Sequence, residues 1–360
     1  MKAVVLAGGQ DIGNCPLSMV RPRVLFPLVN EVLLEHALRT IRHTRIKEAA
    51  VCSNGKTSPI SSFLADHPVA RLSVSYSEDR LPRGAAGCLR DAADLLVDGP
   101  FLVIEGNLFI HGDFGELIAE HRRRGAALTV GVVPIDNWHS GDGEKCLASN
   151  LAPLGVYVVE PSVLDSVPAF GYWDMKEQLI PKLTKRGLPL SFIPFHARHR
   201  RVADAASYAS VVQEILSGVF GAASFTGLRK IAPDVWVGTN VHVSPTAKLV
   251  GPLVLEDDVV VGDRAAVRGP SIIGERTVIE DEAIVAQTIV WTDAKIGARA
   301  TVDGSIVTDG FRVRAFGRLL NSIAIDRSLK VGEVHGLMQR GYDVNPMSRF
   351  VPNFLGSLFS

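Results

Sequence analysis

The sequence predicts an α/β fold in two parts: a mostly parallel sheet covered by helices, followed by a parallel β-helix. The first observation is an alternation of strand-like and helix-like segments through residues 1–222. Such alternation is typical of a parallel sheet with helices on both faces. The second observation is an aliphatic residue that returns every six residues from Ile231 onward. This period is the signature of a β-helix, in which each unit forms one flat side of a coil.

The first part contains short runs with the composition of buried strands, separated by segments of helical periodicity. In the first of these segments, Leu34, Leu38 and Ile41 fall on one helix face. The expected strands are 2–6, 48–53, 74–77, 101–104, 127–133 and 154–159, and the expected helices lie near 34–41, 85–96, 115–123, 161–167, 174–185 and 207–216. Ligands of such sheets bind beyond the carboxyl ends of the strands. The loops that follow Leu6 and Ile104 are therefore the expected ligand-binding loops.

The second part keeps its rhythm over about five coils. The register slips by one residue before Val290 and again before Val307. The residue after each aliphatic one is usually small or acidic, as at Gly238 and Glu256, which lets the chain turn a corner. The residues expected to point inward are Ile231, Val237, Val243, Leu249, Leu255, Val261, Val267, Ile273, Ile279, Val285, Val290, Ile296, Val302, Val307 and Val313. Stacked coils share one core, so 228–325 is expected to be a single domain that follows an α/β domain of residues 1–222.

The bulk composition excludes several classes of protein. The chain has 360 residues with 38 Lys+Arg and 38 Asp+Glu, a net charge of zero, which argues against a nucleic-acid or membrane-surface binder. Its cysteines are scattered, which fits a reducing compartment and no structural zinc. We find no signal peptide and no stretch near the roughly 20 apolar residues of a membrane span. These features predict a cytoplasmic protein.

Several motifs in the first part follow one another in a recognisable order. The chain opens with MKAVVLAGG, and GAAGCLRDAADLL, PFLVIEGN and LGVYVVEPSVLDSV follow. With the hexapeptide repeat, these motifs resemble the sugar-nucleotide pyrophosphorylases, which join a nucleoside triphosphate to a sugar 1-phosphate. The layout is similar to that of mannose-1-phosphate guanylyltransferases with a C-terminal left-handed β-helix. The resemblance implies a Rossmann-like nucleotidyltransferase domain.

The resemblance also implies where ligands bind. The sugar phosphate is expected beside Gly155 and Arg198. The nucleotide is expected to contact Leu6, Ala7, Gly8, Gly9, Gly84, Ala85, Gly87 and Gly106. The glycines of both loops are equally explained as tight turns that the fold requires.

The chain departs from the family's motifs at each charged position. A glycine, an arginine and a lysine that lie in the family's phosphate-binding loops are replaced by Asp11, Gly13 and Arg23. The two aspartates that hold Mg²⁺ in the family are replaced by Asn107 and Arg201. Mg²⁺ prefers carboxylate oxygens, and each loss of about 1.4 kcal/mol of transition-state stabilisation slows a reaction tenfold. These degenerate positions predict little or no conventional turnover, and no catalytic residue is assigned.

Two alternatives remain open at this stage. In the first, the chain is an active guanylyl-, thymidylyl- or uridylyltransferase with relocated Mg²⁺ ligands, for which Glu105, Asp204 and Asp113 are the candidates. Mg²⁺ is an expected cofactor only in that case. In the second, the chain is a β-helix acyltransferase with His242 or His335 as its base, although the long insertion loops that are usual in such enzymes are absent.

Two further segments have more than one interpretation. The sequence HARHRR, from His196 to Arg201, either clamps a phosphate without metal or is a solvated basic strand end. The tail 326–360 either packs on its own β-helix or docks a second subunit. The leading hypothesis is a non-catalytic subunit that binds a nucleotide or nucleotide sugar. Its β-helix and tail would contact a second copy or a related catalytic or other protein subunit.

Overall fold

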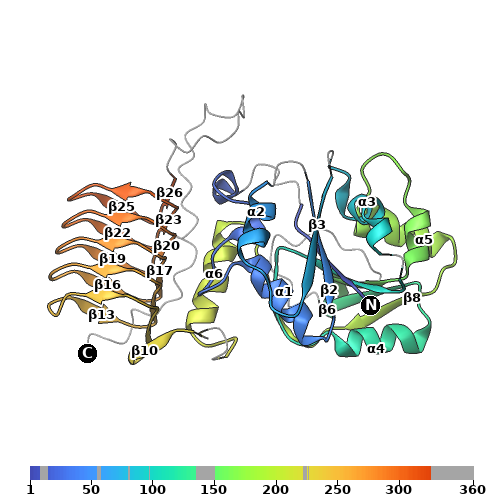
Figure 1. Ribbon diagram of the computed structural model, residues 1–360, viewed down its shortest axis with the longest axis horizontal. Helices are drawn as coiled ribbons and strands as arrows, with labels where there is room; N and C mark the ends of the chain where they lie inside the picture. The colour runs from blue at the N-terminus through green and yellow to red at the C-terminus, as the bar shows by residue number, and fades with distance from the viewer. Residues whose placement is uncertain are drawn as a thin grey trace. The chain divides into compact units, whose positions relative to one another are not determined.

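The computed structural model describes residues 1–8, 15–54, 58–79, 82–96, 98–134, 151–221, 225 and 227–325. The chain forms two compact units, and each is described by itself (Figure 1). The first unit contains most of residues 1–203, and the second contains 204–325 together with the short segments 15–20 and 27–30. The domain boundary expected at residue 222 stays a prediction.

The first unit is built on a seven-stranded sheet in the order β3-β2-β1-β4-β7-β6-β8. Strand β7 is antiparallel to β4 and β6, and all other neighbours are parallel. Central strands are buried on both faces, which explains the unbroken apolar run of β1. The predicted mostly parallel sheet is confirmed. Its strands are β1 (Ala3–Leu6), β2 (Glu48–Asn54), β3 (Ser73–Asp79), β4 (Phe101–Glu105), β6 (Leu128–Pro134), β7 (Leu151–Val159) and β8 (Leu190–Pro194).

Helices cover both faces of this sheet (Figure 1). Residues alternate along β4, so that Leu102 and Ile104 join the core beneath α1 and α4, whereas Phe101 and Val103 join the core beneath α3 and α5. The helices of the chain are α1 (Leu33–His43), α2 (Ser58–Asp66), α3 (Gly84–Asp91), α4 (Gly115–Arg124), α5 (Ile180–Lys185) and, in the second unit, α6 (Ala205–Leu216). Shorter helical turns are η1 (Pro16–Met19), η2 (Arg23–Leu25), η3 (Ala93–Leu95), η5 (Pro161–Ser166) and the π-helical η6 (Met175–Leu179).

Two helices that the sequence predicts as continuous are interrupted. The segment 174–185 divides into η6 and α5, because Pro181 has no backbone N–H to donate to the carbonyl four residues earlier. Asp174 caps η6, and its Oδ1 accepts bonds from the Lys176 and Glu177 amides at 2.6 and 3.1 Å. The segment 85–96 divides into α3 and η3. The interruption at η6 matters because π-helical turns are frequent at functional sites.

The second unit contains the β-helix. Its strands form three sheets, and each parallel strand pairs with the equivalent strand of the next coil, as Leu255 does with Ile273 and Ile273 with Val290. Five full coils precede the last strand, which matches the prediction. The strands are β10 (Arg229–Ala232), β11 (Val235–Val237), β12 (His242–Val243), β13 (Lys248–Val250), β14 (Leu253–Leu255), β15 (Val260–Val261), β16 (Ala266–Arg268), β17 (Ser271–Ile273), β18 (Val278–Ile279), β19 (Ile284–Ala286), β20 (Ile289–Val290), β21 (Lys295–Ile296), β22 (Thr301–Asp303), β23 (Ile306–Val307), β24 (Arg312–Val313), β25 (Arg318–Leu320) and β26 (Ile323–Ala324).

The expected inward positions are buried from Leu255 to Val313. Ile231 is an exception, because its side chain is 44% exposed. It lies on β10, which pairs antiparallel with β11 and belongs to no coil, so the inward assignment of Ile231 was wrong. Val243 and Leu249 are only half-buried, since they belong to the first coil, which has a neighbouring coil on one side only.

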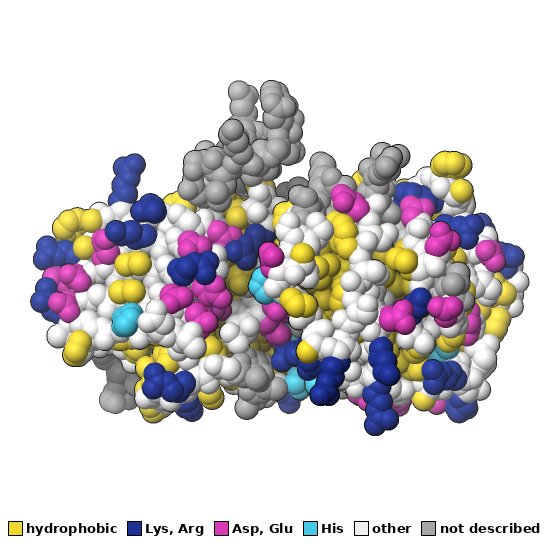
Figure 2. Space-filling view, in the orientation of Figure 1, with side chains coloured by type: hydrophobic (Ala, Val, Ile, Leu, Met, Phe, Trp, Pro, Cys, Tyr) yellow, Lys and Arg dark blue, Asp and Glu magenta, His cyan; other side chains and the backbone are white. Residues whose placement is uncertain are grey.

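Corners of the β-helix depend on glycine and on left-handed backbone. At Gly274 a Cβ atom would lie 2.8 Å from the Val290 carbonyl oxygen of the next coil, so a larger residue does not fit there. Two residues later Arg276 has a φ of 56°, a left-handed conformation that turns the chain. Oppositely charged side chains of successive coils also pair, as Arg264 does with Glu282. Figure 2 shows basic and acidic side chains side by side on the β-helix.

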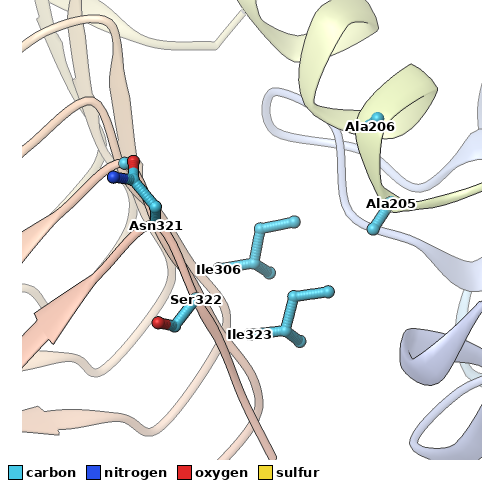
Figure 3. Close-up of a pocket in the computed structure, with 7 residues that line it drawn as sticks. Ala205, Ala206, Ile306, Asn321, Ser322 and Ile323 are labelled. Carbon is cyan, nitrogen blue, oxygen red and sulfur yellow. The ribbon is translucent and has the colours of Figure 1, made fainter. Parts of the chain in front are cut away.

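Within the second unit, α6 is attached to the β-helix by a buried pair of aromatic residues. The Trp291 indole donates to the Tyr208 hydroxyl at 3.0 Å, and that hydroxyl donates to the Pro27 carbonyl. Figure 3 shows Ile306 and Ile323 of the β-helix pointing toward α6. The cavity there is about 10 Å³, about the size of a single water, so it is a packing defect and not a ligand site.

Glu256 makes the stability of the second unit depend on pH. Its side chain lies at a β-helix corner, is 9% exposed, and accepts a bond from the Asn30 amide at 3.3 Å. Burial raises the pKa of Glu256 to about 7 from its usual 4.5. The folded form therefore holds this proton more tightly than the unfolded form. The associated stabilisation is complete below about pH 4.5 and is lost as the pH rises to about 7.

We expect Glu256→Gln to remove this loss. The variant should match the wild type at pH 4.5 and be more stable at pH 8 by about 3 kcal/mol at most, because glutamine keeps the acceptor for Asn30 without a charge. Thermal unfolding from pH 4.5 to 8 measures the effect. Asp303→Asn, at an exposed position of β22, is the control and should leave the pH profile unchanged, because Asp303 takes no part in the shift of Glu256. A wild-type-like profile for Glu256→Gln would contradict the assignment.

Candidate functional site

The expected ligand-binding loops start at adjacent strand ends of the first unit. Leu6 at the end of β1 pairs with Glu105 at the end of β4. The Ala7 and Gly8 amides donate to the Cys52 carbonyl at 2.7 and 3.3 Å. The predicted nucleotide-binding position Gly9 and the degenerate positions Asp11 and Gly13 lie outside the described residues. The described part of this loop is therefore tied to the β2 strand end by its backbone.

The remaining glycines of the predicted nucleotide site are required by packing. A Cβ at Gly106 would lie 2.8 Å from the Leu6 carbonyl oxygen, and one at Gly84 would lie 2.5 Å from the Trp173 carbonyl oxygen. The amides of Gly87 and of the residue before it both donate to Trp173, at 3.2 and 3.0 Å. Ala85 lies in the same first turn of α3. The geometry of this helix start is thus explained by the contact with Trp173, and its role toward a nucleotide stays a prediction.

The position at which the resemblance predicts a metal ligand contains a guanidinium. Arg201 ends β9 (Arg198–Arg201), which pairs antiparallel with β5 (Leu108–His111). Its Nη1 donates to Glu105 Oε2 at 2.5 Å and to Asn107 Oδ1 at 2.9 Å, and its Nη2 donates to the Leu154 carbonyl at 2.7 Å. The Arg201 side chain is 11% exposed and that of Glu105 is 19% exposed. The two degenerate metal positions, Asn107 and Arg201, are therefore bonded to each other.

Two residues that sequence reasoning missed complete this cluster. The Tyr157 hydroxyl of β7 donates to Glu105 Oε1 at 2.9 Å, and Lys176 Nζ of η6 lies 3.3 Å from the same oxygen. Gly155, which the resemblance placed on the sugar-phosphate side, packs against the cluster. A Cβ there would lie 2.7 Å from the Glu105 carboxyl carbon. The interrupted helix at η6 is what presents Lys176 to the strand end.

The electrostatics of the cluster favour an ionised Glu105. Burial alone raises the pKa of Glu105, but the charges of Arg201 and Lys176 and the hydrogen bonds from Arg201 and Tyr157 outweigh it and lower the pKa to about 2. Burial and the adjacent Glu105 charge raise the pKa of Tyr157 well above its usual value. The cluster at neutral pH is thus a carboxylate bonded to a guanidinium, an ammonium and a neutral phenol.

These residues do not fit a divalent metal ion. Arg201 brings a permanent positive charge to within 2.5 Å of Glu105, the carboxylate nearest to that position, and a second cation there is repelled. Within the described ranges, no group of three or more His, Cys, Asp or Glu side chains could hold a metal. The other proposed ligands have structural roles: Asp204 caps α6 through the Ser207 amide at 2.8 Å, and Asp113 accepts from the Gly115 amide at 2.9 Å.

The basic segment HARHRR does not act as one cluster. Residues alternate along β9, so Arg198 and Arg201 point to opposite sides. Arg198 pairs across the ribbon with His111, away from the Glu105 cluster. The expectation that Arg198 serves the sugar phosphate stays untested. Arg23 lies in η2.

Of the two histidines considered for acyl transfer, the structure describes only His242. His242 is exposed on β12, and its ring Nε2 lies 3.1 Å from the Asn240 side-chain oxygen. His335 lies outside the described residues. Among the helices of the described residues, none has the length and apolar composition of a membrane span.

Comparisons with known proteins agree with this architecture. Residues 2–140 match the family model described as nucleotidyl transferase. The chain is 23% identical to a UTP--glucose-1-phosphate uridylyltransferase of Synechocystis, covering 89% of this chain and 90% of the relative. It is also 23% identical to a probable mannose-1-phosphate guanylyltransferase of Oryza sativa subsp. japonica, covering 92% and 93%. A solved structure of a putative glucose-1-phosphate thymidylyltransferase from Bacillus anthracis aligns with a TM-score of 0.51 at 18% identity, over 59% of this chain and 94% of that one.

The fold and the matched segment define a nucleotidyltransferase-type α/β domain followed by a β-helix. The predicted resemblance to sugar-nucleotide pyrophosphorylases is confirmed: residues 2–140 match the nucleotidyl transferase model, and a relative named as a probable mannose-1-phosphate guanylyltransferase aligns over nearly the whole chain.

Proposed function

We propose that this chain is a non-catalytic member of the family, a regulatory or scaffold subunit that binds a nucleotide sugar. The observation that carries the proposal is the Arg201 guanidinium bonded to both Glu105 and Asn107. In this family the metal-binding aspartates neutralise a phosphate-rich transition state through their ion. Here both are replaced, and the nearest carboxylate is already bonded within the protein.

The charge requirement of the reaction explains why this replacement matters. Transfer of a nucleotidyl group releases diphosphate, and catalysis of such reactions is mainly positioning and neutralisation of charge. Asn107 offers one neutral oxygen, and Arg201 already donates to it. A permanent cation fixed by three acceptors is not free to follow the charge that develops on a leaving group. The cluster therefore supports a binding role better than a catalytic one.

Binding of a nucleotide sugar depends less than catalysis on the charged side chains that this chain has replaced. Backbone groups at the β1 strand end can contact a base and ribose without any charged side chain. The β-helix offers a rigid surface for a second copy or for a related catalytic or other protein subunit. We place the protein in the cytoplasm, in keeping with its scattered cysteines and neutral charge.

Pyrophosphate release tests the proposal directly. The purified chain is incubated with each nucleoside triphosphate, Mg²⁺ and a panel of sugar 1-phosphates, beside an active guanylyltransferase as positive control. We expect no release above a heat-inactivated blank, together with thermal stabilisation by at least one nucleotide sugar that persists in EDTA. Robust release by this chain would instead establish the rival, an active pyrophosphorylase with relocated metal ligands. Absence of any thermal response would leave a scaffold without nucleotide binding and refute the binding half of the proposal.

A further inference from the structure

The first unit has a second candidate site at the opposite end of its sheet from the Glu105 cluster. A cavity of about 340 Å³ lies between the end of α1 and one face of α4, and we name it the α1–α4 pocket. Such a volume is in the range of small-molecule sites. Its lining residues are Met1, Thr44, Arg45, Ile46, Gly115, Ile118, Ala119 and Arg122. Met1 and Ile46 precede β1 and β2, so the pocket lies at the amino ends of these strands.

The pocket combines an apolar floor with a cationic rim. Ile46 and Ile118 are buried, whereas Arg45 and Arg122 are exposed. Among the residues that the structure describes, neither arginine side chain has an ion-pair or hydrogen-bond partner, in contrast to Arg124, which is paired with Glu120 at 3.0 Å on the same helix.

Helical spacing explains why neither acidic residue of α4, Glu116 nor Glu120, is among the lining residues. Gly115, Ile118, Ala119 and Arg122 follow the i, i+3, i+4, i+7 pattern of one helix face. The acidic residues of α4 lie off this face, and Glu120 is engaged by the arginines that follow Arg122. The lining of the pocket is therefore positive although the chain as a whole is neutral.

The acidic side chains nearby in this part of the first unit are bonded to other groups. Glu31 is hydrogen-bonded to His36 and Arg39, and Asp113 accepts a hydrogen bond from the Gly115 amide. These two carboxylates therefore already have partners other than Arg45 and Arg122.

We propose that the α1–α4 pocket binds a small organic phosphate, with the phosphate between Arg45 and Arg122 and the organic part on Ile46 and Ile118. Planar guanidinium groups match the geometry of phosphate oxygens, and two of them suit a dianion better than a single carboxylate. The pocket shares no residue with the Glu105 cluster, so this proposal does not depend on the proposed function. It gives the chain a second, regulatory ligand site.

Calorimetric titration of the full chain with phenyl phosphate, inorganic phosphate and phenol tests the proposal. Phenyl phosphate should bind most tightly, inorganic phosphate more weakly because it leaves the apolar floor bare, and phenol not measurably. Arg122→Gln should weaken phenyl phosphate binding about tenfold or more. Arg45→Asn should do the same, because asparagine tolerates the left-handed backbone that Arg45 adopts (φ 65°).

Arg124→Gln is the matched control, since it removes one positive charge from the same helix turn without touching the pocket. It should leave the affinity within about twofold of the wild type. The proposal is overturned if phenyl phosphate does not bind, if both pocket variants bind it normally, or if Arg124→Gln weakens binding as much as Arg122→Gln does. Unchanged melting temperatures of the exposed-arginine variants show that a loss of binding is not a loss of folding.

Discussion

Arg201→Ala is expected to lower the free energy of unfolding by about 3 kcal/mol, because it removes one partner of the Arg201–Glu105 ion pair. Removal of one partner of a mostly buried ion pair leaves the other charge poorly compensated, at a typical cost of 3–5 kcal/mol. Lys176 remains 3.3 Å from Glu105 and offsets part of that cost. Chemical denaturation of the wild type and the variant at pH 7 measures the difference.

Acid titration gives an independent reading of the same interaction. The pKa of Glu105 is lowered to about 2 from its usual 4.5, so its stabilisation is present above about pH 4.5 and is lost as the pH falls toward 2. The wild type should lose about 3 kcal/mol over that window on this account, and Arg201→Ala should lose less. Glu105→Gln combined with Arg201→Met should cost less than the sum of the single changes, because the two residues are coupled.

Arg123→Ala is the control for this prediction. Arg123 also forms an ion pair, with Glu120 at 2.7 Å, but that pair is exposed and solvent already screens it. Its removal should change stability little. If Arg201→Ala proves as mild as Arg123→Ala, then Glu105 is well solvated in the protein and the closed ion-pair cluster does not exist in solution.

The fold was predictable because the six-residue repeat of the β-helix and the strand–helix alternation of the α/β unit can both be recognised from short stretches of sequence. The six-residue repeat fixes which aliphatic residues stack, and each one-residue slip appears in the structure as a shorter coil, such as that from Ile273 to Val290. The strands of the α/β unit stand out because central strands are apolar on both faces. Errors occur where tertiary context decides: Ile231 keeps the rhythm but lies on an antiparallel strand at the end of the stack, with no coil to enter.

The candidate site was only half predictable. Comparison of motifs indicates that Asn107 and Arg201 replace charged ligands, but it does not show that the replacements bond to each other or that Glu105 joins them. Tyr157 could have been found, because it follows Gly155 by two residues on one strand and therefore shares its face. Lys176 could not have been found, because its approach to Glu105 depends on a π-helical turn that hydrophobic periodicity does not predict.

The double substitution Asn107→Asp with Arg201→Asp is expected to create a divalent metal site where the wild type has none. The Val202 amide donates to the Asn107 carbonyl at 2.8 Å, and Arg201 pairs with Leu108, so positions 107 and 201 lie on adjacent strand ends and carboxylates at both would lie beside Glu105. Three carboxylates in one partly buried place repel one another, and a hard cation relieves the repulsion. Thermal unfolding with and without Mn²⁺ or Mg²⁺ measures the gain. A ligand at 100 times its dissociation constant stabilises the folded state by about 2.7 kcal/mol.

The single variant Asn107→Asp separates metal binding from a general increase in negative charge. It keeps Arg201, whose guanidinium should bond to the new carboxylate and leave no place for a metal ion, so its melting temperature should not respond to Mn²⁺. The wild type should behave in the same way. A folded double variant without any Mn²⁺-dependent shift would show that Arg201 is not what keeps metal out, and the electrostatic basis for a non-catalytic chain would have to be found elsewhere. A metal-dependent shift in the double variant alone would identify one guanidinium as the feature that separates this chain from a metal-binding relative.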